Sequence, residues 1–269
     1  MTNGHRFHPT VLREYDIRGI VGDTLSAADA YAVGRGLGTI VAGKGGKRVA
    51  IGYDGRLSSP ELAQAAAEGL LVSGLEAVRV GLGPTPMLYY AARELQLDAG
   101  LMITGSHNPS EYNGFKMMIG KASFWGKDIQ ELGRVAAAGA YATGTGRISD
   151  RDVLDDYVAR LLKDYRPGRD LKVVWDAGNG AAGQAMVKLV AKLPGRHILL
   201  NEAIDGTFPA HHPDPTVAKN LVQLQERVRA ERADLGIAFD GDGDRIGVVD
   251  GEARILWGDQ ILALLASEV

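Results

Sequence analysis

The chain has 269 residues, of which 45% are hydrophobic and 23% are charged, so it can form one large globular domain or two of ordinary size. A net charge of −3 gives no electrostatic reason to expect binding to nucleic acid or to an anionic membrane. Cysteine is absent, which excludes disulfides and cysteine zinc sites and suits a reducing cytoplasm. The N-terminal residues lack the apolar segment of a signal peptide, and the longest apolar runs are too short to span a bilayer. We therefore expect a cytoplasmic protein.

The first half of the chain alternates segments with strand-like and helix-like patterns. Ser59 and Pro60 are typical of an N-cap and a first helical residue. Such alternation is typical of βαβ units, in which helices cover a largely parallel sheet. The patterns predict strands at 48–54, 77–82, 99–104 and 114–119, helices at 58–74 and 85–96, and a glycine-rich helix around 32–38 packed closely on the sheet.

A glycine- and threonine-rich segment, 139–150, interrupts this pattern and is predicted to be a linker or turn. Apolar residues at helical spacing follow over 152–165, and a second α/β unit begins with LKVVWDAGNG at 171. We therefore expect an α/β protein with two consecutive domains, 1–150 and 151–269, each a mixed, mostly parallel sheet sandwiched by helices.

The stretch ITGSHNP places a serine, Ser106, in a turn directly after the strand predicted at 99–104. Glycine, serine, asparagine and proline are ordinary turn residues, so the pattern alone does not require a function. The carboxyl ends of strands in open α/β sheets are, however, where ligands bind. Ser106 is therefore a candidate nucleophile on display, with Gly105 leaving room around it.

The stretch FDGDGDR places Asp240, Asp242 and Asp244 between two apolar strands. Three carboxylates at close range repel one another, and a divalent cation between them removes that cost. An EF-hand would need Gly and Glu where Arg245 and Gly251 stand, so that type of calcium loop is excluded. Oxygen ligands without His or Cys favour Mg²⁺.

Arg245 directly follows these aspartates and is suited to a polyoxygen anion rather than to a metal, because arginine pairs with phosphate through two parallel hydrogen bonds. A metal, a phosphate and a serine together are the components of phosphoryl transfer.

Four motifs in chain order resemble the phosphohexomutase superfamily, in particular its bacterial phosphomannomutase/phosphoglucomutase group. They are YDIRG near the start, TGSHNP, YNGFK and FDGDGDR, and the stretches DAGNGAAG and FPAHHPDP are also similar. The resemblance spans nearly the whole chain. It implies an enzyme that interconverts hexose 1-phosphate and hexose 6-phosphate through a phosphoserine and a hexose 1,6-bisphosphate, which also serves as activator.

The resemblance also implies the parts of the site. The phosphoserine would be Ser106, with its loop in the first domain, and Lys116 or, alternatively, His107 would carry the proton of the sugar hydroxyl. Arg245 would stabilise the transferring oxygens, and Tyr15 and Arg18 would bind the substrate. Mg²⁺ would be held by the second domain's Asp240, Asp242 and Asp244 together with the phosphate on Ser106.

Members of the superfamily have four domains, of which the third recognises the sugar and the fourth holds the distal phosphate. Only the first two are matched here, so we expect C-terminal domains of the same enzyme as missing partners. The chain alone is then expected to have little or no turnover.

Other interpretations stay open at this stage. Gly178, Gly180 and Gly183 with Glu202 fit a dinucleotide-binding fingerprint and would indicate an oxidoreductase, although a tight strand-to-helix turn also explains the glycines. A serine hydrolase lacks its Gly-x-Ser-x-Gly motif. A non-catalytic module that binds Mg²⁺ and a phosphosugar remains possible. The histidines at 211–212 are expected in a rigid proline-flanked loop, and His5 and His8 on a loose N-terminus.

Overall fold

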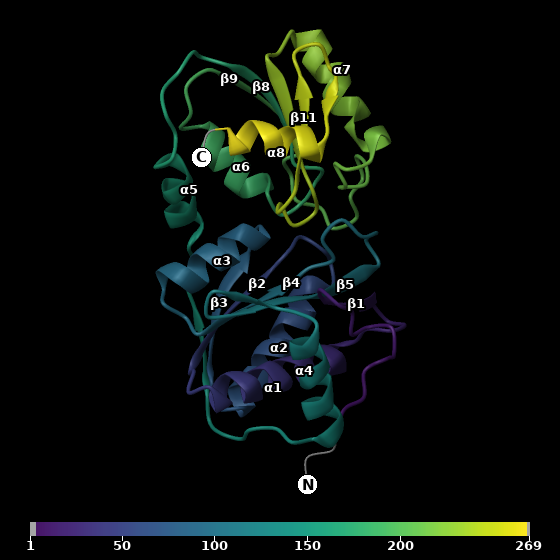
Figure 1. Cartoon of the computed structure of the whole chain (residues 1–269), viewed down its shortest axis with the longest axis vertical. Coiled ribbons are helices and arrows are strands. Elements are labelled where there is room, and N and C mark those ends of the chain that lie inside the picture. The colour runs from purple at the N-terminus through teal and green to yellow at the C-terminus, as the bar shows by residue number, and fades with distance from the viewer. Residues whose placement is uncertain (1–3, 268–269) are drawn as a thin grey trace. The chain divides into compact units, whose positions relative to one another are not determined.

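The computed structural model describes residues 4–267, which form two compact units. The first unit comprises the chain up to Gly105 and Pro109–Val153, and the second comprises Ser106–Asn108 and the chain from Leu154 onward. Each unit has its own sheet with helices packed on it (Figure 1). The predicted fold class is therefore confirmed, while the boundary at 150/151 and the functions assigned to the two domains stay predictions.

The sheet of the first unit is mixed, with strand order β1-β5-β4-β2-β3-β7 and β6 paired with β5. Strands β2, β3, β4 and β7 are parallel, and the other pairings are antiparallel. Because β2 and β4 are central, their buried residues, 49–52 and 99–103, are apolar or small on both faces. The strands are β1 (Ile17–Ile20), β2 (Arg48–Tyr53), β3 (Glu76–Leu82), β4 (Ala99–Ile103), β5 (Tyr112–Ile119), β6 (Ala122–Phe124) and β7 (Arg147–Asp150).

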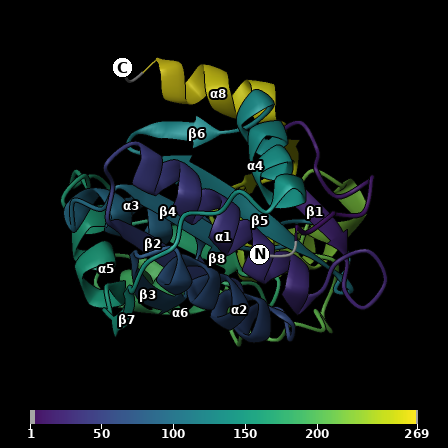
Figure 2. The same ribbon diagram turned by 90° about the horizontal axis from the view of Figure 1, so that it is seen from below.

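Helices cover both faces of this sheet. Figure 1 shows α3 on one face and α1, α2 and α4 on the other, and the view from below in Figure 2 shows α1 and α2 beside each other in front of the strands. The helices are α1 (Ala27–Gly43), α2 (Ser59–Val72), α3 (Thr85–Glu94) and α4 (Lys127–Ala138).

Two predictions for this unit are wrong in detail. The N-cap of α2 is Ser58, not Ser59, because the Ser59 hydroxyl donates to Asp54 at 2.6 Å instead of capping the helix. The segment 139–150 is not all linker, because its last residues form β7, which pairs with β3 and packs Ile148 against the core. A four-residue edge strand is too short to show a periodic pattern.

The glycine-rich segment is helical as predicted, but its glycines face other helices and not the sheet. A Cβ atom on Gly34 would lie 2.1 Å from the Ala66 carbonyl oxygen of α2, and one on Gly69 would lie 2.3 Å from the Tyr31 carbonyl oxygen of α1. A Cβ atom on Gly36 would contact Leu132 of α4. The backbones of α1 and α2 therefore approach each other through reciprocal glycine contacts.

The second unit has a sheet of order β12-β11-β10-β8-β9, in which β8 is parallel to β9 and β10 while β10, β11 and β12 are antiparallel. The elements are α5 (Leu154–Leu162), β8 (Lys172–Asp176), α6 (Gly183–Val190), β9 (Arg196–Leu200), a 3₁₀ turn (Ala218–Leu221), α7 (Val222–Glu231), β10 (Leu235–Phe239), β11 (Ile246–Asp250), β12 (Ile255–Leu256) and α8 (Gly258–Ala266).

Alternation along β8 divides the apolar contacts of this unit between the two faces. Val174 joins the cluster of α7, which includes Leu224 and Val228, whereas Trp175 packs in the cluster of α6 with Met186. The sheet is therefore buried on both sides, as its apolar strands predict.

Two histidines near the N-terminal end of the described residues make side-chain contacts. His5 is not loose, because its Nε2 lies 2.8 Å from Asp29 Oδ1 and its ring contacts Phe7 edge-on. His8 is within 2.9 Å of the Thr10 hydroxyl.

Of the helices within residues 4–267, none combines the length and the apolar character needed to cross a lipid bilayer.

We expect Gly34→Ala to lower the free energy of unfolding by about 1–3 kcal/mol, because the added methyl group would force α1 and α2 apart. The matched control is Gly43→Ala at the end of the same helix, where a Cβ atom would meet no other atom within 4 Å. Urea unfolding of both variants measures the difference. Equal stability of the two variants would contradict the close-packing account.

Candidate active site

Ser106 follows β4 by three residues and has a left-handed backbone conformation, with φ of +50°. Residues other than glycine rarely adopt this conformation, and they do so mostly where the surrounding structure imposes it. The side chain is only 1% exposed, so the serine that the sequence predicts to be on display is covered in this structure. Local backbone strain at a buried hydroxyl makes this turn a candidate functional element.

A buried pair, Asp54 and Arg56, holds the residues of the first unit that flank this turn. Asp54 Oδ2 accepts the Gly105 N–H at 3.1 Å and Arg56 Nε–H at 3.2 Å. Arg56 Nη1 donates to the carbonyl oxygens of Pro109 and Tyr112. A Cβ atom on Gly105 would lie 2.3 Å from the Arg56 guanidinium carbon. Gly105 therefore makes room for Arg56, whereas the sequence led us to expect that it makes room for Ser106. Neither Asp54 nor Arg56 was predicted for the site, although DGR directly after β2 was the available signal.

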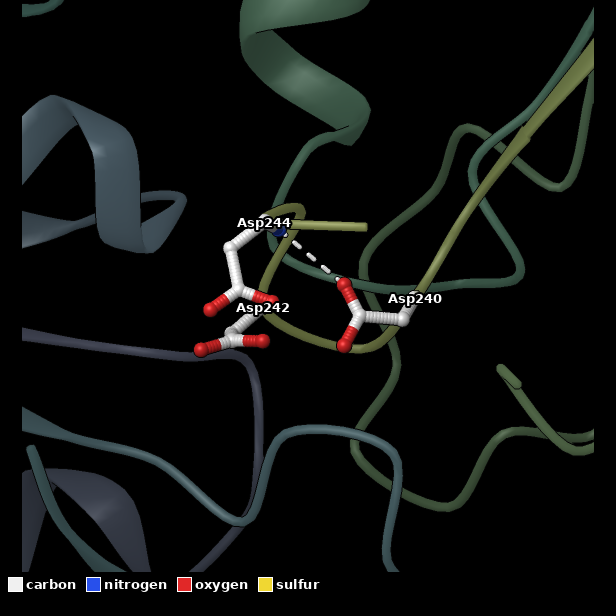
Figure 3. A group of neighbouring side chains, drawn as sticks. All are labelled: Asp240, Asp242 and Asp244. Carbon is white, nitrogen blue, oxygen red and sulfur yellow. Dashed lines mark hydrogen bonds between the residues drawn. The ribbon is translucent and has the colours of Figure 1, made fainter. Parts of the chain in front are cut away.

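The three aspartates of FDGDGDR lie on the hairpin between β10 and β11. Their carboxylate oxygens lie within 4.8 Å of one another, a grouping that can hold a metal ion (Figure 3). Asp240 Oδ1 accepts the backbone N–H groups of Asp244 at 3.0 Å and Arg245 at 3.1 Å. The hairpin thus orients the first carboxylate through its own backbone.

Burial makes this cluster electrostatically costly. Asp240 and Asp242 are both 0% exposed, whereas Asp244 is exposed. Burial first, and then the negative charges of Asp242 and Asp244, raise the pKa of Asp240 to about 8. A divalent cation with oxygen ligands would remove this cost, so the residues fit a hard metal ion.

Ser106 belongs to the second unit by its contacts, and its hydroxyl joins the carboxylate cluster. Ser106 Oγ donates to Asp240 Oδ2 at 3.0 Å, and His107 Nδ1 lies 3.3 Å from the same hydroxyl oxygen. A Cβ atom on Gly241 would lie 2.4 Å from the Ser106 carbonyl oxygen, so a larger residue cannot stand between Asp240 and Asp242. The serine and the acidic loop, 134 residues apart in sequence, are thus in direct contact.

Of the other candidate residues, Arg245 belongs to the second unit, and Tyr15, Arg18 and Lys116 belong to the first. Arg245 is exposed at the end of the acidic loop. Arg18 is buried in the first unit, where its guanidinium donates to the Gly105 carbonyl oxygen and pairs with Asp16. Tyr15 is 78% exposed and stacks on Trp125, with ring centroids 6.3 Å apart. Lys116 is half-buried on β5, opposite Met102 of β4.

The glycines that fit a dinucleotide-binding fingerprint pack against protein. A Cβ atom on Gly183 would lie 2.1 Å from the Glu202 carbonyl oxygen, and one on Gly180 would lie 2.9 Å from the Gly241 carbonyl oxygen. Glu202 therefore contributes backbone at this point, and the loop after β8 supports the acidic loop. A close strand-to-helix turn accounts for these glycines without a nucleotide.

Comparison with known proteins agrees with this geometry and places the two units among the α/β/α domains of one protein family. The models for phosphoglucomutase/phosphomannomutase α/β/α domain I and domain II match residues 9–140 and 155–253. The chain belongs to the phosphoglucomutase/phosphomannomutase family. This membership does not favour the dinucleotide-dependent alternative.

Individual relatives match nearly the whole chain. Phosphomannomutase/phosphoglucomutase of Pseudomonas aeruginosa is 44% identical over 260 residues, which are 97% of this chain and 56% of the relative. Phosphoglucomutase of Neisseria meningitidis is 42% identical over 261 residues, 96% of this chain and 57% of the relative. A crystal structure of a phosphoglucomutase/phosphomannomutase family protein from Burkholderia thailandensis superposes with a TM-score of 0.94 at 42% identity, covering 97% of this chain and 59% of that one. The chain thus spans a little over half the length of these relatives.

We expect the metal-free protein to lose stability as the pH rises from about 4 to about 8, because the raised pKa means that the folded state holds a proton on Asp240 that the unfolded state releases. This stabilising contribution is complete below the ordinary pKa of aspartate and is lost as the pH passes the folded value. Asp240→Asn cannot ionise and should show a smaller decline. Thermal unfolding in EDTA at several pH values measures this decline in stability for the parent and the variant.

The control for this titration is Glu226→Gln, which removes an exposed carboxylate from α7 of the same unit and should keep the parent's pH profile. If Asp240→Asn also follows the parent's profile, Asp240 is ionised in the metal-free protein.

Proposed function

We propose that this chain carries the phosphoryl-transfer site of a phosphohexomutase, an enzyme that interconverts hexose 1-phosphate and hexose 6-phosphate through a phosphoserine and a hexose 1,6-bisphosphate. The observation that carries the proposal is the hydrogen bond from Ser106 Oγ to Asp240, which joins a hydroxyl nucleophile to a cluster of three carboxylates. The names of the relatives support the same reaction class.

The metal of the site is proposed to be Mg²⁺, held by Asp240, Asp242, Asp244 and a phosphate on Ser106. The three carboxylates supply only hard oxygen ligands, and the raised pKa of Asp240 reflects charge that a cation would balance. When bound, the cation would neutralise negative charge on the oxygens of the transferring group.

The remaining roles follow from the chemistry of one transfer. The bond between phosphorus and Ser106 Oγ breaks, and a bond forms between phosphorus and the sugar hydroxyl oxygen. That hydroxyl releases a proton, for which Lys116 is the proposed acceptor, and the serine oxygen gains one. The distance of 3.3 Å from His107 Nδ1 to Ser106 Oγ supports His107 as the donor. Arg245 is proposed to pair with the phosphoryl oxygens.

Substrate binding and setting complete the proposal. Tyr15, exposed in the first unit, and Arg18, which supports the Gly105 carbonyl group, are proposed to contact the hexose phosphate or to order the loop that does. A cytoplasmic location is proposed because the absence of cysteine suits a reducing compartment. C-terminal domains of the same enzyme are proposed as partners needed for full turnover, in keeping with relatives of which this chain covers 56–57%.

We expect Ser106 to acquire one phosphoryl group when the protein is incubated with Mg²⁺ and glucose 1,6-bisphosphate. Intact mass and phosphopeptide mapping detect it, and Ser106→Ala should abolish it. Ser110→Ala is the matched control, since Ser110 is an exposed hydroxyl in the same turn. A label on another residue of Ser106→Ala, or no label on the parent, would favour a module that binds without transfer.

We expect Asp242→Asn to abolish detectable Mg²⁺ binding in calorimetry while the metal-free protein stays folded. Loss of one charged ligand weakens a hard-cation site, and loss of one buried negative charge relieves the repulsion on Asp240. The thermal midpoint in EDTA should therefore stay equal or rise, whereas Glu226→Gln should leave both binding and stability unchanged. Binding of Mg²⁺ by Asp242→Asn at the parent's affinity would show that the metal lies elsewhere.

A further inference from the structure

Asp176, the last residue of β8, is fully buried and accepts three hydrogen bonds. Its Oδ1 accepts the Gly178 N–H and the Asn201 amide, each at 2.9 Å. Its Oδ2 lies 2.8 Å from Nε2 of His211. Since a carboxylate offers only lone pairs, Nε2 of His211 is the donor.

The second nitrogen of His211 also faces an acceptor. Its Nδ1 lies 3.1 Å from the carbonyl oxygen of His212, which carries no proton. Hydrogen bonding to Asp176 raises the pKa of His211 against the opposing effect of burial.

The pair of Asp176 and His211 holds the turn that follows β8. Gly178 has φ of +53°, and a Cβ atom on it would lie 3.2 Å from Pro213 and 3.3 Å from the His211 ring. Three residues later, the Ala181 N–H donates to the Gly241 carbonyl oxygen at 2.9 Å. The turn is therefore fixed at one end by His211 and bonded at the other to the residue between two of the clustered aspartates.

Two further contacts connect the same parts. Asp176 lies opposite Ala238 in the parallel pairing of β8 with β10. Ala238 precedes Asp240 by two residues. A Cβ atom on Gly241 would lie 3.5 Å from the Pro213 ring. The segment 211–213 thus reaches the acidic loop both through the turn after β8 and through Pro213.

We propose that His211 is a positioning residue of the metal site, which acts by bridging Asp176 and its own segment so that the turn after β8 holds Gly241 and the flanking aspartates in their converging arrangement. The inference rests on the proposed metal site. It assigns no contact of His211 with the metal, with phosphate or with sugar.

Three substitutions of His211 separate hydrogen bonding from packing. In His211→Gln the amide nitrogen takes the place of Nε2 and can still donate to Asp176, whereas in His211→Asn it takes the place of Nδ1 and cannot. His211→Ala removes both ring nitrogens. Mn²⁺ is the probe, and its affinity is measured by electron paramagnetic resonance on the whole chain.

We expect His211→Asn and His211→Ala to weaken Mn²⁺ binding about tenfold and His211→Gln to retain it within about threefold, since residues that orient metal ligands typically contribute at least a factor of ten. His212→Asn is the matched control, because His212 takes part through its carbonyl group, and it should bind like the parent. Proton-coupled ¹⁵N spectra should show a proton on Nε2 of His211, as donation to Asp176 requires.

The outcomes distinguish this inference from the proposed metal site. No Mn²⁺ binding by the parent overturns the metal site and this inference with it. If the parent binds Mn²⁺ and His211→Asn and His211→Ala bind it equally well, whatever their thermal midpoints, only the role of His211 is overturned. Equal weakening in His211→Gln, His211→Asn and His211→Ala would show that ring packing, rather than the bridge to Asp176, is what matters, and would also overturn that role.

Discussion

Repulsion among three carboxylates is the constraint around which the second unit is built. Two of them are fully buried, and burial together with the neighbouring charges raises the pKa of Asp240. Only a rigid surrounding keeps such groups together. Backbone N–H groups of the hairpin, the Ser106 hydroxyl and the turn after β8 all contact this loop, so the cost is distributed over segments distant in sequence.

Glycine backbone is the means by which these segments come so close. Gly180, Gly241 and Gly105 each lie where a Cβ atom would collide with a carbonyl oxygen or with the Arg56 guanidinium group. The same close approach of glycine backbone joins α1 to α2 in the first unit. Conformational freedom explains few of these positions, since only Gly178 among the glycines of the turn after β8 has a positive φ; close approach explains the others.

The sequence predicts those parts of the site whose signal is local. Alternating Asp and Gly between apolar strands predicts the acidic cluster, and Ser106 after a strand predicts a turn at the carboxyl edge of a sheet. The contact of Ser106 with Asp240 spans 134 residues, so only the family resemblance could indicate it. Arg56 and the Asp176–His211 pair were missed because burial and long-range pairing give a charged residue no periodic signal, and β7 was missed because four residues at a sheet edge carry too little pattern.

A tryptophan next to the acidic loop, Trp175, bears on the fluorescence of the protein. The Trp175 indole stacks on Phe239, with centroids 6.4 Å apart and planes 8° from parallel, and its N–H is bonded to His197. Trp175 directly precedes Asp176, and Phe239 directly precedes Asp240, so the stacked rings join the bases of the two loops. Indole emission depends on neighbouring rings and on the indole hydrogen bond. The fold therefore places an indole fluorophore, one of three tryptophans in the chain, where the strands that lead into the two loops lie side by side.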